Sequence, residues 1–214
     1  MITRQYSPFD QFIHVLDQAL HTTLGPAPGP SRPNPAGEQA EAELTAAERE
    51  LAGRLMRVNH AGEISAQALY QGQALTARLP TVRDKMEQAA VEENDHLAWT
   101  EERIHELGTH TSILAPLWYA GSFAIGALAG IAGDKWSLGF VAETEHQVIR
   151  HLDAHLARLP EQDVKSRAIL ELMRDDEARH ATTALAAGGA ALPDPVRQLM
   201  ALTSKTMTTT AYWL

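Results

Sequence analysis

The sequence contains no cysteine among its 214 residues. This absence excludes disulfide bonds, CxxC redox centres, cysteine-ligated zinc and ordinary iron–sulfur clusters. Positive charge is also scarce, because 18 lysines and arginines are outnumbered by 27 acidic residues, leaving a net charge of −9. That balance gives no electrostatic reason to expect nucleic acid or anionic lipid as a partner. The ten histidines and the acidic residues are therefore the main stock of metal ligands.

The length suggests one domain with or without an extension, and it is sufficient for a sizeable buried core. With 44% apolar and 21% charged residues, the composition is that of a globular protein. Residues 1–10 carry no apolar run, so we expect neither a signal peptide nor a transit peptide. A cytoplasmic, reducing compartment is the default expectation.

The N-terminal region, residues 1–39, differs in composition from the rest of the chain. Between Phe9 and Leu24 apolar residues recur at three- and four-residue spacing, which predicts a short amphipathic helix. We favour docking of this helix on the main body over a position on a membrane surface. Residues 25–37 contain five prolines and predict an extended linker.

Residues 40–214 predict an all-α domain, because they are rich in helix-forming residues and lack alternating β-branched runs. Thr45 and Glu48 form a capping box for the first helix. The expected long helices run to about Arg78, from about Thr81 to Leu107, from Asp134 or Ser137 to near Leu159, and from about Asp163 to Ala187, with a last short helix through Leu199 and Met200. Short loops within each pair make the neighbours antiparallel, as in a four-helix bundle.

The pattern Glu-x-x-His places a carboxylate and an imidazole on one helical face, where both can reach one metal ion. The sequence contains four copies: Glu93/His96, Glu102/His105, Glu143/His146 and Glu177/His180. The helical face on which each copy lies decides whether its side chains point into the bundle. The first and last copies fall within the apolar stripes of their helices, whereas the other two share their faces with charged or polar residues and are expected to be solvated.

The selected set is Glu63, Glu93, His96, Glu145, Glu177 and His180. Phase places five of them inward, whereas the phase of Glu63 is less clear because Gly62, Ala66 and Leu69 are its neighbours on the helical wheel. Their order is a lone glutamate followed by Glu-x-x-His, twice, with intervals of 30 and 32 residues between the two glutamates of each half. Four ionised carboxylates would balance two divalent metals. Without metal they would repel one another and be poorly solvated.

Oxygen and imidazole ligands without sulfur suit iron or manganese, and zinc is a further option. Ferritin-like di-iron and di-manganese carboxylate proteins use this ligand arrangement. The alternative is that these are ordinary inward polar residues paired with arginine or histidine. We favour the metal site over this alternative, because all six residues fall in register across four helices.

The stretch 111–133 contains 23 residues without a charge and could span a bilayer by length. A span would place Glu93 and His96 on the opposite side of the membrane from Glu145, so the proposed site argues against it. Two readings are left: a crossover helix buried on the bundle, or an apolar surface in contact with the membrane. We favour lipid contact over full burial. Ser122, Gly126 and Gly130 recur every four residues and allow close helix contact.

From about Leu51 to its C-terminus the sequence resembles the demethoxyubiquinone hydroxylases of ubiquinone biosynthesis. The segments that carry the resemblance are Arg57-Val-Asn-His-Ala-Gly-Glu63, Glu92-Glu-Asn-Asp-His96, Val141-Ala-Glu-Thr-Glu145 and Asp176-Glu-Ala-Arg-His180. The resemblance implies a ferritin-like bundle with an apolar crossover helix. It also implies a di-iron monooxygenase that hydroxylates a polyprenylated methoxy-methyl-benzoquinol with dioxygen.

The family's iron ligands fall on the same six residues, which implies two Fe ions per chain and dioxygen as co-substrate. A further histidine of the family falls on His151, for which we expect a role beside the ligands or in electron transfer. The resemblance also implies a peripheral position at the cytoplasmic face of the cell membrane, with contact through 111–133. Electrons are expected from NADH acting through the quinone, from the quinol or from a reductase. A homo-oligomer or a biosynthetic complex is a further expectation.

Three competing functions use the same residues. A ferritin-like ferroxidase or iron store would use the same kinds of metal ligand, but it would need a soluble shell of subunits and no long apolar crossover. A di-manganese catalase would differ in its metal and in its activity on peroxide. A membrane-associated helical scaffold with a structural metal would show metal-dependent folding and no oxygen consumption with a quinol.

Overall fold

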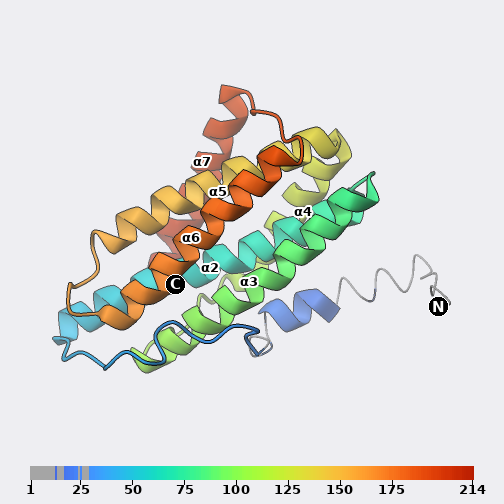
Figure 1. Ribbon diagram of the computed structural model, residues 1–214. Helices are drawn as coiled ribbons and strands as arrows, with labels where there is room; N and C mark the ends of the chain where they lie inside the picture. The colour runs from blue at the N-terminus through green and yellow to red at the C-terminus, as the bar shows by residue number, and fades with distance from the viewer. Residues whose placement is uncertain (1–12, 14–16, 24, 26–28) are drawn as a thin grey trace, which may run out of the picture.

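The computed structural model describes residues 13, 17–23, 25 and 29–214. The long elements in this part of the chain are all helices: α2 (Ala46–Thr76), α3 (Pro80–Glu106), α4 (Ala115–Ala132), α5 (Asp134–Leu156), α6 (Val164–Ala186) and α7 (Asp194–Trp213). Helices α2, α3, α5 and α6 lie along one another as a bundle (Figure 1). The predicted all-α, ferritin-like four-helix bundle with a crossover helix is therefore confirmed.

The helix starts follow the local sequence signals. The Thr45 side chain accepts from the Glu48 backbone N–H while the Glu48 carboxylate accepts from the Thr45 N–H, so both halves of the capping box are present. Pro80 occupies the first turn of α3, where its missing N–H costs no helical hydrogen bond. Asp163 caps α6 by accepting from the Ser166 N–H at 3.1 Å.

The bundle consists of two helix pairs, α2 with α3 and α5 with α6, which pack together through α3–α6 and α2–α5 contacts. Apolar clusters fill the core. Met56, Trp99 and Met173 belong to one cluster. Tyr70 and Val141 belong to another. The inward polar residues considered below come from these same four helices.

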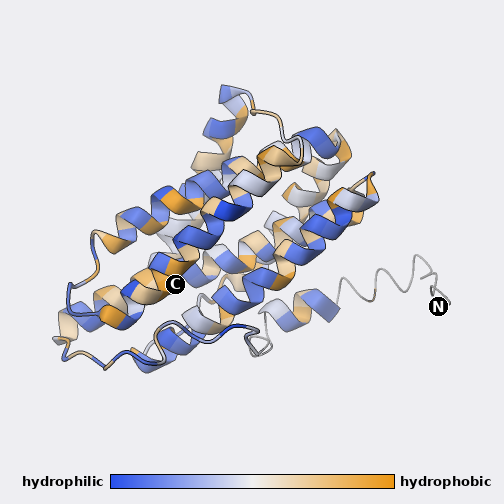
Figure 2. Cartoon of the chain, in the orientation of Figure 1, coloured by the Kyte–Doolittle hydropathy of each residue, from blue (hydrophilic) through white to orange (hydrophobic). Residues whose placement is uncertain are grey.

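Helix α4 crosses between the two pairs and packs along α2. A Cβ atom at Gly126 would collide with the backbone of Leu69, and one at Gly130 would collide with the Thr76 side chain, so these glycines permit the close approach. The opposite face of α4 exposes Leu117, Leu128 and Ile131. Only 22% of the helix is buried, which contradicts full burial within this chain. Figure 2 shows α4 mainly in pale and orange colours, whereas the visible faces of α3 and α6 carry many hydrophilic residues.

The last helix differs from the prediction of a short element through Leu199 and Met200. Helix α7 continues to Trp213 and is 20 residues long. Threonines weaken the helical pattern after Met200, but their hydroxyls donate to carbonyls one turn earlier, as Thr206 does to Leu202 at 3.0 Å. Ala211 is buried against α2 in a cluster with Val58, so tertiary packing supports the additional turns.

The described residues of the N-terminal region, among them 17–23 and 29–39, lie against the bundle. Residues 17–23 are helical, in agreement with part of the predicted amphipathic helix, whose residues 9–12, 14–16 and 24 lie outside the described part. The Thr22 hydroxyl donates to Gln67 on α2. Residues 29–45 form no helix. They run beside α3 before α2 begins (Figure 1), and we call this stretch the strap.

Candidate metal centre

The six residues selected from the sequence all lie inside the bundle. Helix α2 contributes Glu63, α5 contributes Glu145, and α3 and α6 each contribute one Glu-x-x-His pair. Their exposed fractions run from 0% for Glu93 and His96 to 8% for His180. The two Glu-x-x-His copies that we expected to be solvated are less buried than these six residues. Glu102, His105 and His146 are exposed, and Glu143 is half-buried.

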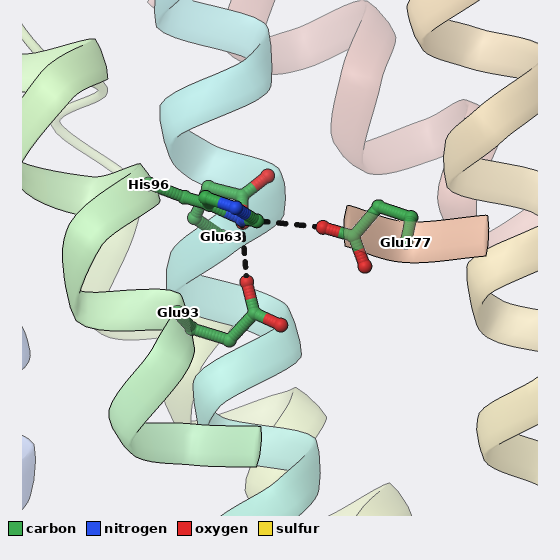
Figure 3. Close-up of side chains that lie close together, drawn as sticks. All are labelled: Glu63, Glu93, His96 and Glu177. Carbon is green, nitrogen blue, oxygen red and sulfur yellow. Dashed lines mark hydrogen bonds and ion pairs between the residues drawn. The ribbon is translucent and has the colours of Figure 1, made fainter. Parts of the chain in front are cut away.

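Four of these residues gather around the His96 ring. Ligand atoms from Glu63, Glu93, His96 and Glu177 lie within 4.8 Å of one another. His96 Nδ1 lies 3.0 Å from Glu93 Oε2 and 3.2 Å from an oxygen of both Glu63 and Glu177. Figure 3 shows these side chains converging from α2, α3 and α6. One imidazole nitrogen and three carboxylates can hold a divalent cation here.

A second group adjoins the first. Glu145, Glu177 and His180 also place ligand atoms within 4.8 Å of one another. His180 Nδ1 lies 3.3 Å from Glu177 Oε2 and 3.4 Å from Glu93 Oε1. Glu177 belongs to both groups, and Glu93 reaches both histidines. These two carboxylates therefore lie between the groups, in the position where they could bridge two ions.

Because the four glutamates are buried close together, their ionised forms are unfavourable in the absence of cations. It raises the pKa of Glu63 and Glu145 well above the usual range, and neighbouring carboxylates add to the effect. Burial also opposes ionisation of Glu93, but His96 and His180 hold its pKa below the usual range. Glu93 Oε1 and Glu145 Oε2 are buried without a hydrogen-bond partner. Unpartnered carboxylate oxygens facing imidazole nitrogens fit a site that binds metal.

Two further carboxylates orient the histidines, and the sequence analysis did not identify them. His96 Nε2–H donates to Asp176 at 3.0 Å, and His180 Nε2–H donates to Glu92 at 2.7 Å. Each acid directly precedes the glutamate of the other Glu-x-x-His pair, so the contacts cross between α3 and α6. Such contacts fix the tautomer and leave Nδ1 free to bind a metal. The doubled acids Glu92-Glu93 and Asp176-Glu177 were the signal available in the sequence.

Tyr70 is another residue that the sequence analysis did not assign to the site. It lies seven residues after Glu63 on α2 and is buried, and its hydroxyl donates to Glu145. Burial raises the pKa of Tyr70, and the nearby Glu145 adds to this effect, so the hydroxyl keeps its proton. The contact holds one Glu145 oxygen, and the other is buried without a hydrogen-bond partner.

His151 is half-buried on α5, and its ring lies 3.9 Å from the ring of His155. It lines a small cavity of about 40 Å³ together with Glu63 and Asn59. Burial lowers the pKa of His151 to about 4, which keeps the ring neutral at physiological pH. The expected role beside the ligands or in electron transfer stays a prediction.

Comparison with known proteins gives one consistent family. The model of the family described as "Ubiquinone biosynthesis protein COQ7" matches residues 50–211. A protein of Nitrosococcus oceani named 3-demethoxyubiquinol 3-hydroxylase is 60% identical over 211 residues, covering 99% of both chains. Proteins of the same name from Stutzerimonas stutzeri and Acinetobacter baumannii are 58% identical over 98% of this chain and 97% of that protein, and 56% identical over 99% and 100%. The chain belongs to the COQ7 family of ubiquinone biosynthesis proteins.

Proposed function

We propose that the protein is a 3-demethoxyubiquinol 3-hydroxylase, a di-iron monooxygenase that adds one hydroxyl group to the ring of a polyprenylated methoxy-methyl-benzoquinol. The observation that carries the proposal is the buried cluster of four glutamates and two histidines in a member of this family. Dioxygen is the co-substrate, one oxygen atom entering the ring and the other leaving as water.

Each residue has a distinct role in this proposal. Glu63 and His96 would hold one Fe ion, Glu145 and His180 the other, and Glu93 and Glu177 would lie between them. The bound metal pair supplies the reduction of dioxygen that ring hydroxylation requires. Asp176 and Glu92 orient the histidines, and Tyr70 restrains Glu145.

A cavity of about 230 Å³ beside the cluster is a suitable place for the quinol ring. Two of its lining residues belong to the site: His180 is a proposed metal ligand, and Tyr70 donates to Glu145. Apolar side chains from α3, α5 and α6 form much of the remaining wall: Met86, Ala89, Leu138, Val141 and Ala184. A substituted aromatic ring would replace water against these apolar side chains.

The apolar face of α4 suggests how the protein gains access to a polyprenyl substrate in the membrane. Its exposed leucines and isoleucines would contact the membrane from the cytoplasmic face, so that the protein is peripheral rather than spanning. Helices α3 and α5 precede and follow α4 but contribute to one cluster, which a membrane crossing by α4 would divide. In this proposal the electrons come from NADH acting through the quinone, from the quinol or from a reductase. The proposal also includes assembly as a homo-oligomer or as part of a biosynthetic complex.

The alternatives are less well supported. The similar proteins are named as hydroxylases, which does not favour a ferroxidase, an iron store or a di-manganese catalase. The exposed apolar α4 is also unexpected for a subunit of a soluble iron-storage shell.

The test is anaerobic loading with iron(II), followed by exposure to ¹⁸O-labelled dioxygen with a prenylated demethoxy-quinol and mass measurement of the product. We expect a product that contains one labelled oxygen atom. Absence of labelled product from iron-loaded protein, with the quinol supplied in reduced form, would contradict the proposal. His105→Ala provides a control that changes an exposed histidine of a second Glu-x-x-His copy.

A further inference from the structure

The strap reaches the candidate centre from outside the segment that the family model matches, residues 50–211. Arg32 lies on the strap. Its Nε donates to Asp95 Oδ2 at 2.7 Å, and its Nη1 lies 2.7 Å from Asp176 Oδ2. Ser31 also donates its backbone N–H to Asp95 Oδ1 at 2.6 Å. One guanidinium thus joins a carboxylate of α3 to a carboxylate of α6.

Asp176 connects this contact to a proposed metal ligand. The Asp176 oxygen that meets Arg32 is also the oxygen that accepts from His96 Nε2 at 3.0 Å. Arg179 occupies the other Asp176 oxygen at 2.7 Å. The Asp176 side chain is 3% exposed and that of Asp95 is 1% exposed, so both carboxylates need partners within the protein.

The geometry favours arginine over any other cation. A guanidinium donates from several nitrogens in fixed directions and can bind two carboxylates at once, whereas an ammonium is a point charge on a flexible stem. The Arg32 guanidinium also lies 5.0 Å from the centre of the Trp99 ring, which in turn lies 5.7 Å from the His96 ring. Arg32 therefore packs against Trp99, whose ring is a neighbour of the histidine that the Asp176 carboxylate contacts.

We propose that Arg32 is a positioning residue of the metal centre, which holds the Asp176 carboxylate against His96 Nε2 so that His96 presents Nδ1 to a metal ion. This inference rests on the proposed function, because it requires that the six-residue cluster binds metal. It adds a residue that lies outside the matched family segment and outside the helical bundle.

The two halves of the centre differ in this support. Glu92, which orients His180, is 32% exposed as a side chain, and its nearest arginine nitrogen, on Arg179, lies 3.9 Å away. The strap therefore supports the His96 half and leaves the His180 half without an equivalent contact from residues 29–45. Loss of Arg32 should weaken the binding of one metal ion and leave the other nearly unchanged.

Cobalt(II) provides a spectroscopic probe for this prediction. We would titrate the wild type, Arg32→Gln and Arg32→Lys with cobalt(II) against a competing chelator. Removing a group that orients a metal ligand typically costs 10–100-fold in affinity, so Arg32→Gln should weaken one of two sites by about 10-fold or more. Arg32→Lys keeps the charge without the fork and should lose less. The exchangeable ring N–H signal of cobalt-bound His96 should exchange faster with water in Arg32→Gln.

Asn34→Ala is the matched control on the strap. Asn34 donates to Glu102 at 2.6 Å, on the exposed side of α3, and contacts none of the proposed ligands. Its cobalt affinities should equal those of the wild type. Thermal unfolding of the metal-free proteins checks folding, and Arg32→Lys carries the test if Arg32→Gln does not fold.

Three results would overturn the inference. Unchanged affinities and ring N–H exchange in the folded Arg32 variants would show that Arg32 does not position His96. An equal loss in Asn34→Ala would assign the effect to general docking of the strap. Failure of the wild type to bind cobalt would instead overturn the proposed function, and this inference with it.

Discussion

Glu145 shows at the residue scale why the centre needs cations. It is 1% exposed, close to Glu93 and Glu177, and one of its oxygens has no hydrogen-bond partner. Tyr70 is its neutral hydrogen-bond partner, and the nearby carboxylates of Glu177 and Glu93 disfavour its charged form. A buried carboxylate in this position lowers stability unless it is protonated or bound to metal.

The variant Glu145→Gln tests this loss of stability through the pH dependence of the free energy of unfolding. Because the pKa of Glu145 is raised in the folded protein, the folded state retains a proton that the unfolded state loses. The metal-free wild type should therefore lose stability relative to Glu145→Gln as pH rises above about 4.5, by at most about 1.4 kcal/mol per pH unit. Urea denaturation of both proteins in chelator between about pH 5 and about pH 7 measures the difference. Parallel pH profiles would contradict it.

A comparison of two histidines tests the choice of Glu-x-x-His copies. His180 is buried within the cluster, whereas His105 is exposed near the end of α3. His180→Ala should lower the iron affinity of one site by about 10-fold or more and abolish hydroxylation. His105→Ala should leave both unchanged. Metal analysis measures the bound iron, and product mass measurement detects hydroxylation. Equal iron content and equal hydroxylation in the two variants would contradict the assignment of His180 as a ligand.

At the element scale, α4 combines a tight inner contact with an exposed apolar face. Gly126 is buried against the α2 backbone, whereas Gly121 on the same helix is exposed and has no atom in contact range of an added Cβ. The four-residue period of Ser122, Gly126 and Gly130 predicted this contact, and the structure shows the close approach at Gly126 and Gly130.

Alanine at Gly126 and alanine at Gly121 should have opposite effects. Gly126→Ala should lower the free energy of unfolding by about 1–3 kcal/mol, because the backbones of α2 and α4 must move apart. Gly121→Ala should raise it by about 0.5–1 kcal/mol, because alanine favours the helix and meets nothing. Denaturant unfolding of both variants gives the values, and a shared sign would show that the packing does not depend on Gly126.

The exposed face of α4 can be tested separately. Leu128 is 66% exposed there, and Val91 is 61% exposed on α3. Leu128→Glu should reduce flotation with phospholipid vesicles by about 10-fold, since placing a charge at an apolar membrane contact costs more than about 1.4 kcal/mol. Val91→Glu should float as the wild type does. Equal flotation of Leu128→Glu and the wild type would rule out membrane contact at this face.

At the scale of the whole molecule, periodicity predicted the bundle because four amphipathic helices each bury one stripe, and capping residues such as Thr45 and Asp163 mark their starts. Phase within those stripes also selected five of the six inward residues, and the repeated order of a lone glutamate and a Glu-x-x-His pair supported Glu63. It could not identify Arg32, because the strap has no periodic structure and its contacts with Asp95 and Asp176 join residues more than 60 positions apart. The extent of α7 was missed for a related reason, since packing of Ala211 against α2 is a tertiary contact.

The most direct test of the account is the number of iron ions that each chain binds. Anaerobic titration with iron(II), followed by metal analysis after gel filtration, should give about two equivalents in the wild type, one for each group of ligands. Glu177→Ala should retain less than about one, because Glu177 belongs to both groups. A wild type that retains no iron, or a Glu177→Ala protein that retains as much as the wild type, would contradict the account.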